Sequence, residues 1–275
     1  MSPPIRVSLE DVTLKLRVRG MRGNSSETMT TPAREVFVGG RIERALWGSH
    51  VVALQNINLT IRDGERVAIL GHNGAGKTTL LRLLAGIYVP SSGVCNLTGE
   101  RAALLNTNLG LSSEMTLTEN VRVALALYGV PLKEINERIP EIIEFAELQA
   151  FADAPLKACS SGMKARLGFG IATSVEPDIF IVDEVFGAGD AQFIPRARRR
   201  LDRLFRGANT LVLSSHSLTV LREFCSTALW LEKGRVRQYG DLEEILKDYA
   251  AFCKERAAEL TGAAPPNRTK SNIAV

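Results

Sequence analysis

One eight-residue segment constrains the fold of this chain more than any other. It matches the pattern GxxxxGK[ST] and reads Gly71-His72-Asn73-Gly74-Ala75-Gly76-Lys77-Thr78. The β-prone residues 65–70 precede it, and the spacing of apolar residues predicts a helix over residues 77–85. Glycines in such a unit allow backbone N–H groups to surround phosphate oxygens, and the helix N-terminus adds its dipole.

The segment, extended by Thr79, therefore predicts a nucleotide-binding site with Mg²⁺, and the family resemblance described below implies that the nucleotide is ATP. Lys77 is expected at the β- and γ-phosphates and the Thr78 hydroxyl at the metal ion. A structural Gly-rich turn is the alternative interpretation.

A second acidic element follows a predicted buried strand at residues 179–182. The strand ends in Asp183, where a Mg²⁺-holding aspartate belongs, and Glu184, which we expect to act as general base on the attacking water. A strand that simply ends in acidic surface residues is the alternative. His216 follows a further predicted strand at residues 210–213. A lone histidine is usually structural, but the strand order favours a sensor of the γ-phosphate.

The arrangement of predicted elements indicates an α/β protein. Strands alternate with helices, which predicts a mainly parallel sheet, and helices concentrate between residues 117 and 174, which suggests an inserted helical lobe. Residues 7–19 alternate as a half-buried edge strand does, residues 35–47 suggest a short amphipathic helix, and residues 228–238 suggest a hairpin with Lys233-Gly234 at its tip. We expect the tail from Ala258 onward to be disordered.

Composition excludes several classes of protein. No stretch approaches the about 20 consecutive apolar residues of a membrane-spanning helix, and residues 1–10 hold no apolar signal core, so we expect a cytosolic chain. Four cysteines without paired spacing do not support a zinc site. The net charge of +4 is mild, and the Arg-rich residues 196–206 are interpreted as a solvated helix face, with an anionic-lipid or partner contact as the alternative. No nucleic-acid partner is expected.

The order of these motifs resembles the ABC-transporter ATPase family over about residues 51–246. In that family a Ser-Gly-Gly signature at a helix start contacts the γ-phosphate bound to a partner subunit. The matching residues here are Ser160, Ser161, Gly162 and Met163, and Asp190 occupies the D-loop position after Glu184. The resemblance implies a P-loop NTPase (RecA-like) core with an antiparallel β-subdomain and an inserted helical subdomain. The expected parts are residues 1–112 and 171–250 for the core, 113–170 for the helical subdomain, and 251–275 for a short tail.

Departures from the general signature point to one branch of the family. Ser161 replaces the middle glycine and Met163 the usual glutamine, and Arg166-Leu167 follows. With Gly-Ala-Gly-Asp-Ala after Glu184, this resembles the ATPases of bacterial polysaccharide exporters for O-antigen, capsule and teichoic acid. The resemblance implies a head-to-tail dimer of two copies, a separate integral membrane permease, a lipid-linked polysaccharide as transported substrate, and a peripheral location on the cytoplasmic face of the inner membrane.

Two expected parts of the family pattern are not evident. No glutamine occurs between Gln55 and Gln149, and Asn106, Asn108 or Ser112 are candidates to replace it. Trp47 is the candidate to stack on adenine, and a loop tryptophan covering apolar surface is the alternative.

Three other functions stay open at this point. An ABC ATPase for another transported substrate is the first. A soluble ABC ATPase acting on nucleic acid or ribosomes is a second possibility, although the middle segment is too short for the long coiled coil that such proteins carry. A regulatory nucleotide-binding module without turnover is the third, and intact Lys77, Asp183, Glu184 and His216 argue against it.

Overall fold

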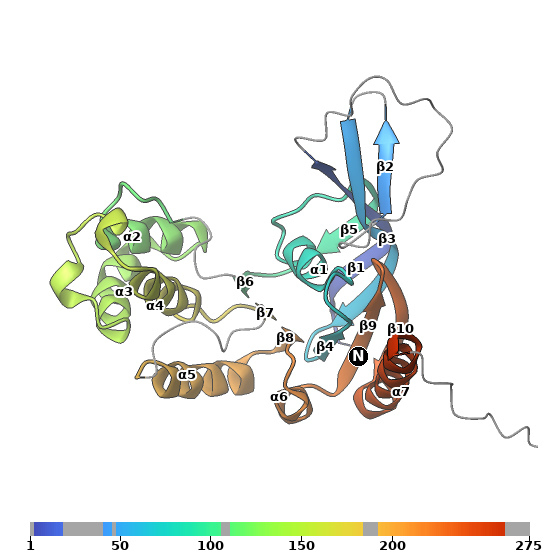
Figure 1. Ribbon diagram of the computed structural model, residues 1–275. Helices are drawn as coiled ribbons and strands as arrows, with labels where there is room; N and C mark the ends of the chain where they lie inside the picture. The colour runs from blue at the N-terminus through green and yellow to red at the C-terminus, as the bar shows by residue number, and fades with distance from the viewer. Residues whose placement is uncertain (1–2, 19–40, 46–47, 106–110, 184–191, 262–275) are drawn as a thin grey trace, which may run out of the picture.

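The computed structural model describes residues 3–18, 41–45, 48–105, 111–183 and 192–261. They form two β-sheets and a separate lobe of helices (Figure 1). The smaller sheet is antiparallel, and its strand order is β2 (Arg41–Ala45), β3 (Gly48–Arg62), β1 (Ile5–Val18) and β5 (Ser92–Leu97). The predicted α/β architecture with an antiparallel β-subdomain and an inserted helical lobe is confirmed.

The larger sheet carries the parallel strands. Its order is β10 (Arg235–Asp241), β9 (Thr227–Glu232), β4 (Arg66–Leu70), β8 (Thr210–Ser214), β7 (Ile179–Asp183) and β6 (Arg101–Leu104). All neighbours in this order are parallel except the β9–β10 hairpin. The carboxyl ends of β4, β7 and β8 therefore meet at one edge, which is where ligands bind in open α/β sheets.

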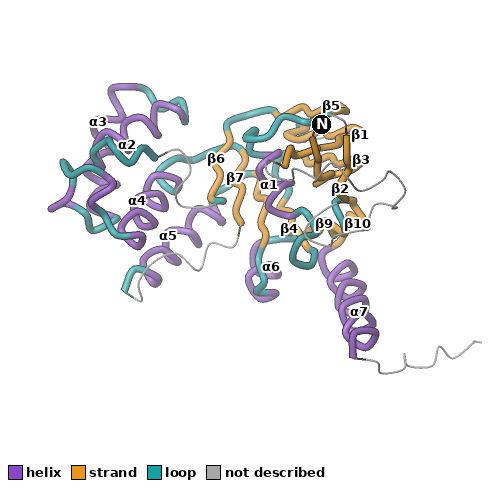
Figure 2. The backbone as a smooth tube through the Cα atoms, turned by 45° about the horizontal axis from the view of Figure 1, so that its top comes forward, coloured by secondary structure: helices purple, strands orange, loops and turns teal. Residues whose placement is uncertain are grey.

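Helix α1 (Lys77–Leu84) packs between the two sheets (Figures 1 and 2). Leu80, Leu81, Leu83 and Leu84 are all fully buried, so the helix is apolar on more than one side. This burial is typical of a helix enclosed in a core rather than of a surface helix. It fixes the start of α1 relative to both sheets.

The remaining helices divide between the lobe and the core. The lobe holds α2 (Leu117–Leu127), α3 (Leu132–Phe145), α4 (Ser161–Ala172) and the 3₁₀ turns Gln149–Phe151 and Leu156–Ala158. A capping box between Thr116 and Glu119 starts α2. The core holds α5 (Ile194–Gly207), α6 (Leu218–Phe224) and α7 (Leu242–Thr261).

Three local predictions are wrong. β1 is an inner strand and not an edge strand, because it pairs with β3 on one side and β5 on the other. Of the predicted helix at residues 35–47, the described part Arg41–Ala45 forms β2 instead and pairs with β3, so sheet pairing overrides the local pattern there. The tail expected over residues 251–275 is wrong for its first part, because α7 continues to Thr261. Its Tyr249 and Phe252 rings pack on Trp230, 5.4 and 5.1 Å between centroids.

Candidate functional site

The phosphate loop joins the end of β4 to the start of α1, as predicted. Gly71, Gly74 and Gly76 all have positive φ, at 152°, 79° and 105°. A Cβ on Gly71 would lie 2.5 Å from the Leu231 carbonyl oxygen, so no side chain fits at that position. The loop thus needs glycine both for its backbone conformation and for its close approach to β9.

Lys77 lies across the loop. Its Nζ donates to the carbonyl oxygens of Gly71, at 2.6 Å, and His72, at 3.3 Å. The ammonium group is therefore held inside the curve of the loop, where an anionic ligand would contact it.

The acidic strand end lies directly beside the loop. Thr78 Oγ1 donates a hydrogen bond of 2.6 Å to Asp183 Oδ2. Asp183 ends β7 and is in register with Ser214 at the end of β8, two residues before His216. The three strand and helix ends thus bring a hydroxyl, a carboxylate and an imidazole to one edge of the parallel sheet.

A cavity of about 280 Å³ occupies this edge. The residues that line it are those predicted for phosphate and metal: His72, Asn73, Gly74, Gly76, Lys77, Thr78, Thr79, Asp183 and His216. Hydroxyl and carboxylate oxygens are the ligands that Mg²⁺ prefers, and the Thr78–Asp183 pair places two of them within hydrogen-bonding distance. The residues present therefore fit a magnesium–nucleotide complex. Ala75 of the same loop is 1% exposed.

The signature residues lie elsewhere, on the helical lobe. Ser160 is the N-cap of α4, and its hydroxyl accepts a hydrogen bond of 3.2 Å from the Met163 backbone N–H. Ser160 and Ser161 are exposed, and a Cβ built on Gly162 would meet only Ser160 Oγ, at 3.9 Å. Within the described part of the chain, none of these residues lines the phosphate cavity. The helix start is open to an anion, but not to one held in the same chain's loop.

Several predicted site residues cannot be placed. Glu184, Asp190, Trp47, Asn106 and Asn108 lie outside the described residues. Ser112, the remaining candidate for the absent glutamine, donates its backbone N–H to the buried Asn120 Oδ1 at 2.7 Å, and it is not among the residues that line the phosphate cavity.

One contact to the phosphate loop was missed from the sequence. Gly234, at the tip of the β9–β10 hairpin, donates its N–H to the Ala75 carbonyl oxygen at 2.9 Å and accepts from the Gln55 N–H at 2.7 Å. The hairpin tip itself was predicted, but nothing in the local pattern indicated that it would meet a loop more than 150 residues earlier. Gly234 therefore ties the loop to β3 as well as to β9.

Comparison with known proteins agrees with this geometry. A family model described as ABC transporter matches residues 54–187. The teichoic acids export ATP-binding protein TagH of Bacillus anthracis is 39% identical over 208 residues, which make up 76% of this chain and 38% of that protein. The O-antigen export system ATP-binding protein RfbB of Klebsiella pneumoniae is 37% identical over 214 residues, 78% of this chain and 87% of that protein. This chain belongs to the ABC transporter family.

The predicted family is thereby confirmed, and both relatives carry names from the branch that the sequence resembles. This ABC transporter chain spans only 38% of the length of the Bacillus anthracis relative. Among solved structures, the ATP-binding subunit of an ABC transporter superposes with a TM-score of 0.63 at 24% identity, over 93% of this chain and 99% of that one, and supports the fold. None of the helices in the described segments combines the length and apolar character that crossing a membrane requires.

Proposed function

We propose that this chain binds and hydrolyses ATP to energise export of a lipid-linked polysaccharide through a separate membrane permease. The observation that carries the ATPase proposal is the cavity shared by Lys77, Thr78, Asp183 and His216. Lys77 would contact the β- and γ-phosphates, and Thr78 with Asp183 would hold Mg²⁺, which supplies charge neutralisation on the phosphate oxygens. The polysaccharide proposal rests on the names of the teichoic acid and O-antigen relatives.

In this proposal, two copies of the chain together form each complete ATP site. Ser160, which is exposed, and Gly162 at the start of α4 do not line the phosphate cavity of their own chain, so they would complete the phosphate site of a second copy arranged head to tail. ATP would then hold the two chains together, and loss of the γ-phosphate would release them. Such a pair would act at the cytoplasmic face of the membrane, with the helical lobe against the permease.

Glu184 would supply the proton acceptor. It follows Asp183 directly in the sequence, and its carboxylate would polarise the attacking water. His216 would act as a sensor of the γ-phosphate beside that water.

The ATPase proposal is tested on the purified chain with Glu184→Gln. We expect this variant to bind ATP, to form a stable dimer seen by light scattering, and to hydrolyse ATP at least about 100-fold more slowly than the unaltered protein. Glu255→Gln, an exposed carboxylate on α7, is the matched control and should hydrolyse normally. Unchanged turnover in Glu184→Gln would show that another group is the base.

The transported substrate is tested in the host. Removal of the gene should abolish surface polysaccharide and leave lipid-linked chains inside the cell, and the gene for Lys77→Ala should fail to restore export. Unchanged surface polysaccharide, with no second exporter present, would contradict the substrate and leave an ABC ATPase for a different cargo.

A further inference from the structure

The arginine-rich helix α5 is not simply a solvated face. Two of its six arginines, Arg196 and Arg200, turn toward the helical lobe, whereas Arg198 and Arg199 between them are exposed. The prediction of a solvated face is therefore wrong for the side of α5 that carries Arg196 and Arg200. Their spacing of four residues places both on one side of the helix.

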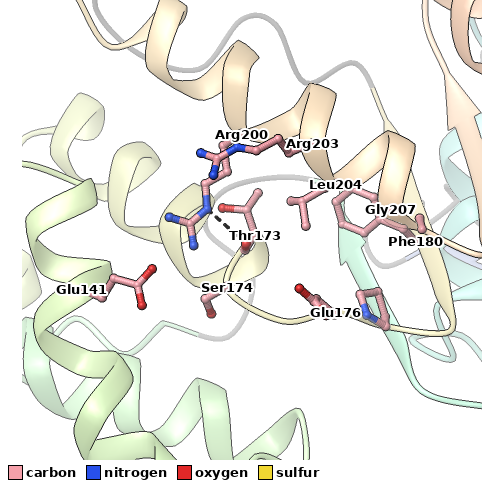
Figure 3. A pocket seen from close by; sticks show the side chains of 11 residues that line it. Glu141, Thr173, Ser174, Glu176, Phe180, Arg200, Arg203, Leu204 and Gly207 are labelled. Carbon is pink, nitrogen blue, oxygen red and sulfur yellow. Dashed lines mark hydrogen bonds between the residues drawn. The ribbon is translucent and has the colours of Figure 1, made fainter.

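Arg200 makes two contacts to the lobe from this side. Its Nε donates to the carbonyl oxygen of Thr173 at 3.1 Å, and its guanidinium carbon lies 4.3 Å from the ring centroid of Phe145 (Figure 3 shows the first contact). Thr173 is the C-cap of α4, and Phe145 is the last residue of α3. A cation at the C-terminus of a helix is favoured by the helix dipole, and a guanidinium over an aromatic face adds a cation–π attraction.

The start of α5 is anchored in the same lobe. Phe193 is fully buried, with its ring centroid 5.5 Å from that of Phe145 and 5.7 Å from that of Phe169 on α4. Arg196 adds an ion pair with Glu147 at 3.3 Å, and the same carboxylate pairs with Arg166 of α4 at 3.2 Å. The first turns of α5 are therefore joined to α4 by packing and by charge.

Beyond Arg200, the lobe and the core are no longer in close contact. A cavity of about 410 Å³ lies there between lobe and core, and its walls include Glu141, Ser174, Glu176, Phe180, Arg200 and Leu204 (Figure 3). Side chains that face this cavity have no packing partner across it, so the interface between lobe and core is held by fewer contacts there. Arg200 therefore lies where the packed part of the interface between lobe and core ends and the cavity begins.

Arg200 joins α5 to α4, and each of these two helices is connected to residues of the proposed catalytic site. The 12 residues of α4 lie between the Ser160 N-cap and the Thr173 C-cap and act as one rigid element, so a shift at Thr173 moves Ser160 too. α5 follows in sequence the residues 184–191, which include Glu184 and Asp190.

We propose that Arg200 is a positioning residue that sets the orientation of α4, and with it Ser160 and Gly162, against the ATP-binding core. This inference rests on the proposed function, because it assigns to α4 the task of meeting the nucleotide of a second copy. Its immediate consequence is visible in a single chain: without Arg200, the angle between lobe and core is less well defined.

That consequence is measured without nucleotide. Spin labels on cysteines introduced at the exposed Glu144 of α3 and Lys247 of α7, with Cys95 and Cys253 changed to serine, report the distance between lobe and core. Arg200→Gln should widen or shift the distance distribution, and the matched variant Arg199→Gln, one position along the same helix, should not. A distribution unchanged by Arg200→Gln would overturn the proposal whatever the fate of the ATPase proposal.

The functional consequence is measured in the Glu184→Gln background. Arg200→Gln should raise the ATP concentration for half-maximal dimer formation about tenfold, a typical size for coupling between sites, while ATP binding to the monomer stays within twofold. The ATP concentration for half-maximal dimer formation in Arg200→Lys should fall between those of Arg200→Gln and of the protein with Arg200 unaltered, because lysine keeps the charge but not the Nε–H donor.

The experiments distinguish failure of the role proposed for Arg200 from failure of the proposed function. Dimer formation that is unchanged by Arg200→Gln would overturn the positioning role, and so would an equal loss of monomer ATP binding, which would indicate a general folding defect. Failure of Glu184→Gln itself to bind ATP would count against the proposed function instead, and the spin-label distances would still decide the role of Arg200.

Discussion

The hydroxyl of Thr78 donates a 2.6 Å hydrogen bond to the carboxylate of Asp183, across 105 residues of sequence. This bond joins the first turn of α1 to the end of β7 and brings together the two oxygen ligands that we assign to Mg²⁺. The hydrogen bond holds the two side chains together without a metal ion, and under our proposal Mg²⁺ would take its place.

Replacement of Thr78 by valine tests this assignment, since valine keeps the shape and removes the hydroxyl. We expect the Mg²⁺ concentration for half-maximal ATPase activity to rise at least about tenfold in Thr78→Val. Thr78→Ser restores the hydroxyl and should lie within twofold of the unaltered protein. Magnesium titrations that give the same midpoint for valine and serine would remove Thr78 from the metal site.

Substitution of Ser160 separates its two roles. Ser160→Ala removes the N-cap hydrogen bond to Met163 and should lower the free energy of unfolding by about 1 kcal/mol, while ATP-driven dimer formation weakens but persists. Ser160→Arg adds a large cation at the exposed helix start and should abolish dimer formation in the Glu184→Gln background, with monomer ATP binding intact. Monomer binding lost in Ser160→Arg would mean that the start of α4 serves its own chain, contrary to the proposed pairing.

The contact between the hairpin tip and the phosphate loop gives a prediction with a matched control. Gly234 and Gly64 both have positive φ, at 73° and 85°, but a Cβ on Gly234 would lie 2.5 Å from the Ala53 carbonyl oxygen, whereas one on Gly64 would meet nothing within 4 Å. Gly64→Ala should therefore cost only the conformational strain of about 1 kcal/mol in unfolding free energy.

Gly234→Ala should cost more in stability and should also weaken ATP binding severalfold, because the hairpin must move and release the Ala75 carbonyl. Chemical unfolding and nucleotide titration of the two variants provide the comparison. Equal ATP affinity in both would show that Gly234 does not support the loop.

These contacts show what the sequence was able to predict and what it was not. The phosphate loop, the strand that ends at Asp183 and the Lys233-Gly234 turn are local patterns, in which a few adjacent residues dictate backbone geometry. The inner position of β1 and the strand nature of β2 depend on pairing with β3, which no single segment encodes.

The contacts of Arg200 and Gly234 depend on tertiary packing in the same way. Arg200 lies in a run of charged residues whose composition indicates a solvated surface, and only the fold shows that it meets Thr173 and Phe145. A sequence therefore predicts a site best where its residues are contiguous, and least where a helix from one lobe meets another.

The buried thiol of Cys225 provides a prediction on pH. Burial raises the pKa of Cys225 to about 12, and the positive charge of Arg66 opposes this only in part. The folded chain thus keeps the thiol protonated where the unfolded chain, with a pKa near 9.0, has lost its proton. The resulting stability is present in full below pH 9 and is lost as the pH rises toward 12.

Denaturant unfolding at pH 8 and pH 10 measures this loss. One proton bound only by the folded state corresponds to a decrease of about 1.4 kcal/mol in unfolding free energy between these pH values. The variant Cys225→Ala lacks the thiol. Its unfolding free energy should therefore decrease between pH 8 and pH 10 by about this amount less than that of the unaltered protein. A thiol reagent at pH 8 should meanwhile modify the exposed Cys253 and spare Cys225 in the folded chain. Equal pH dependence in the two proteins, or rapid modification of Cys225, would show that the end of α6 and the start of β9 open far more readily than their packing indicates.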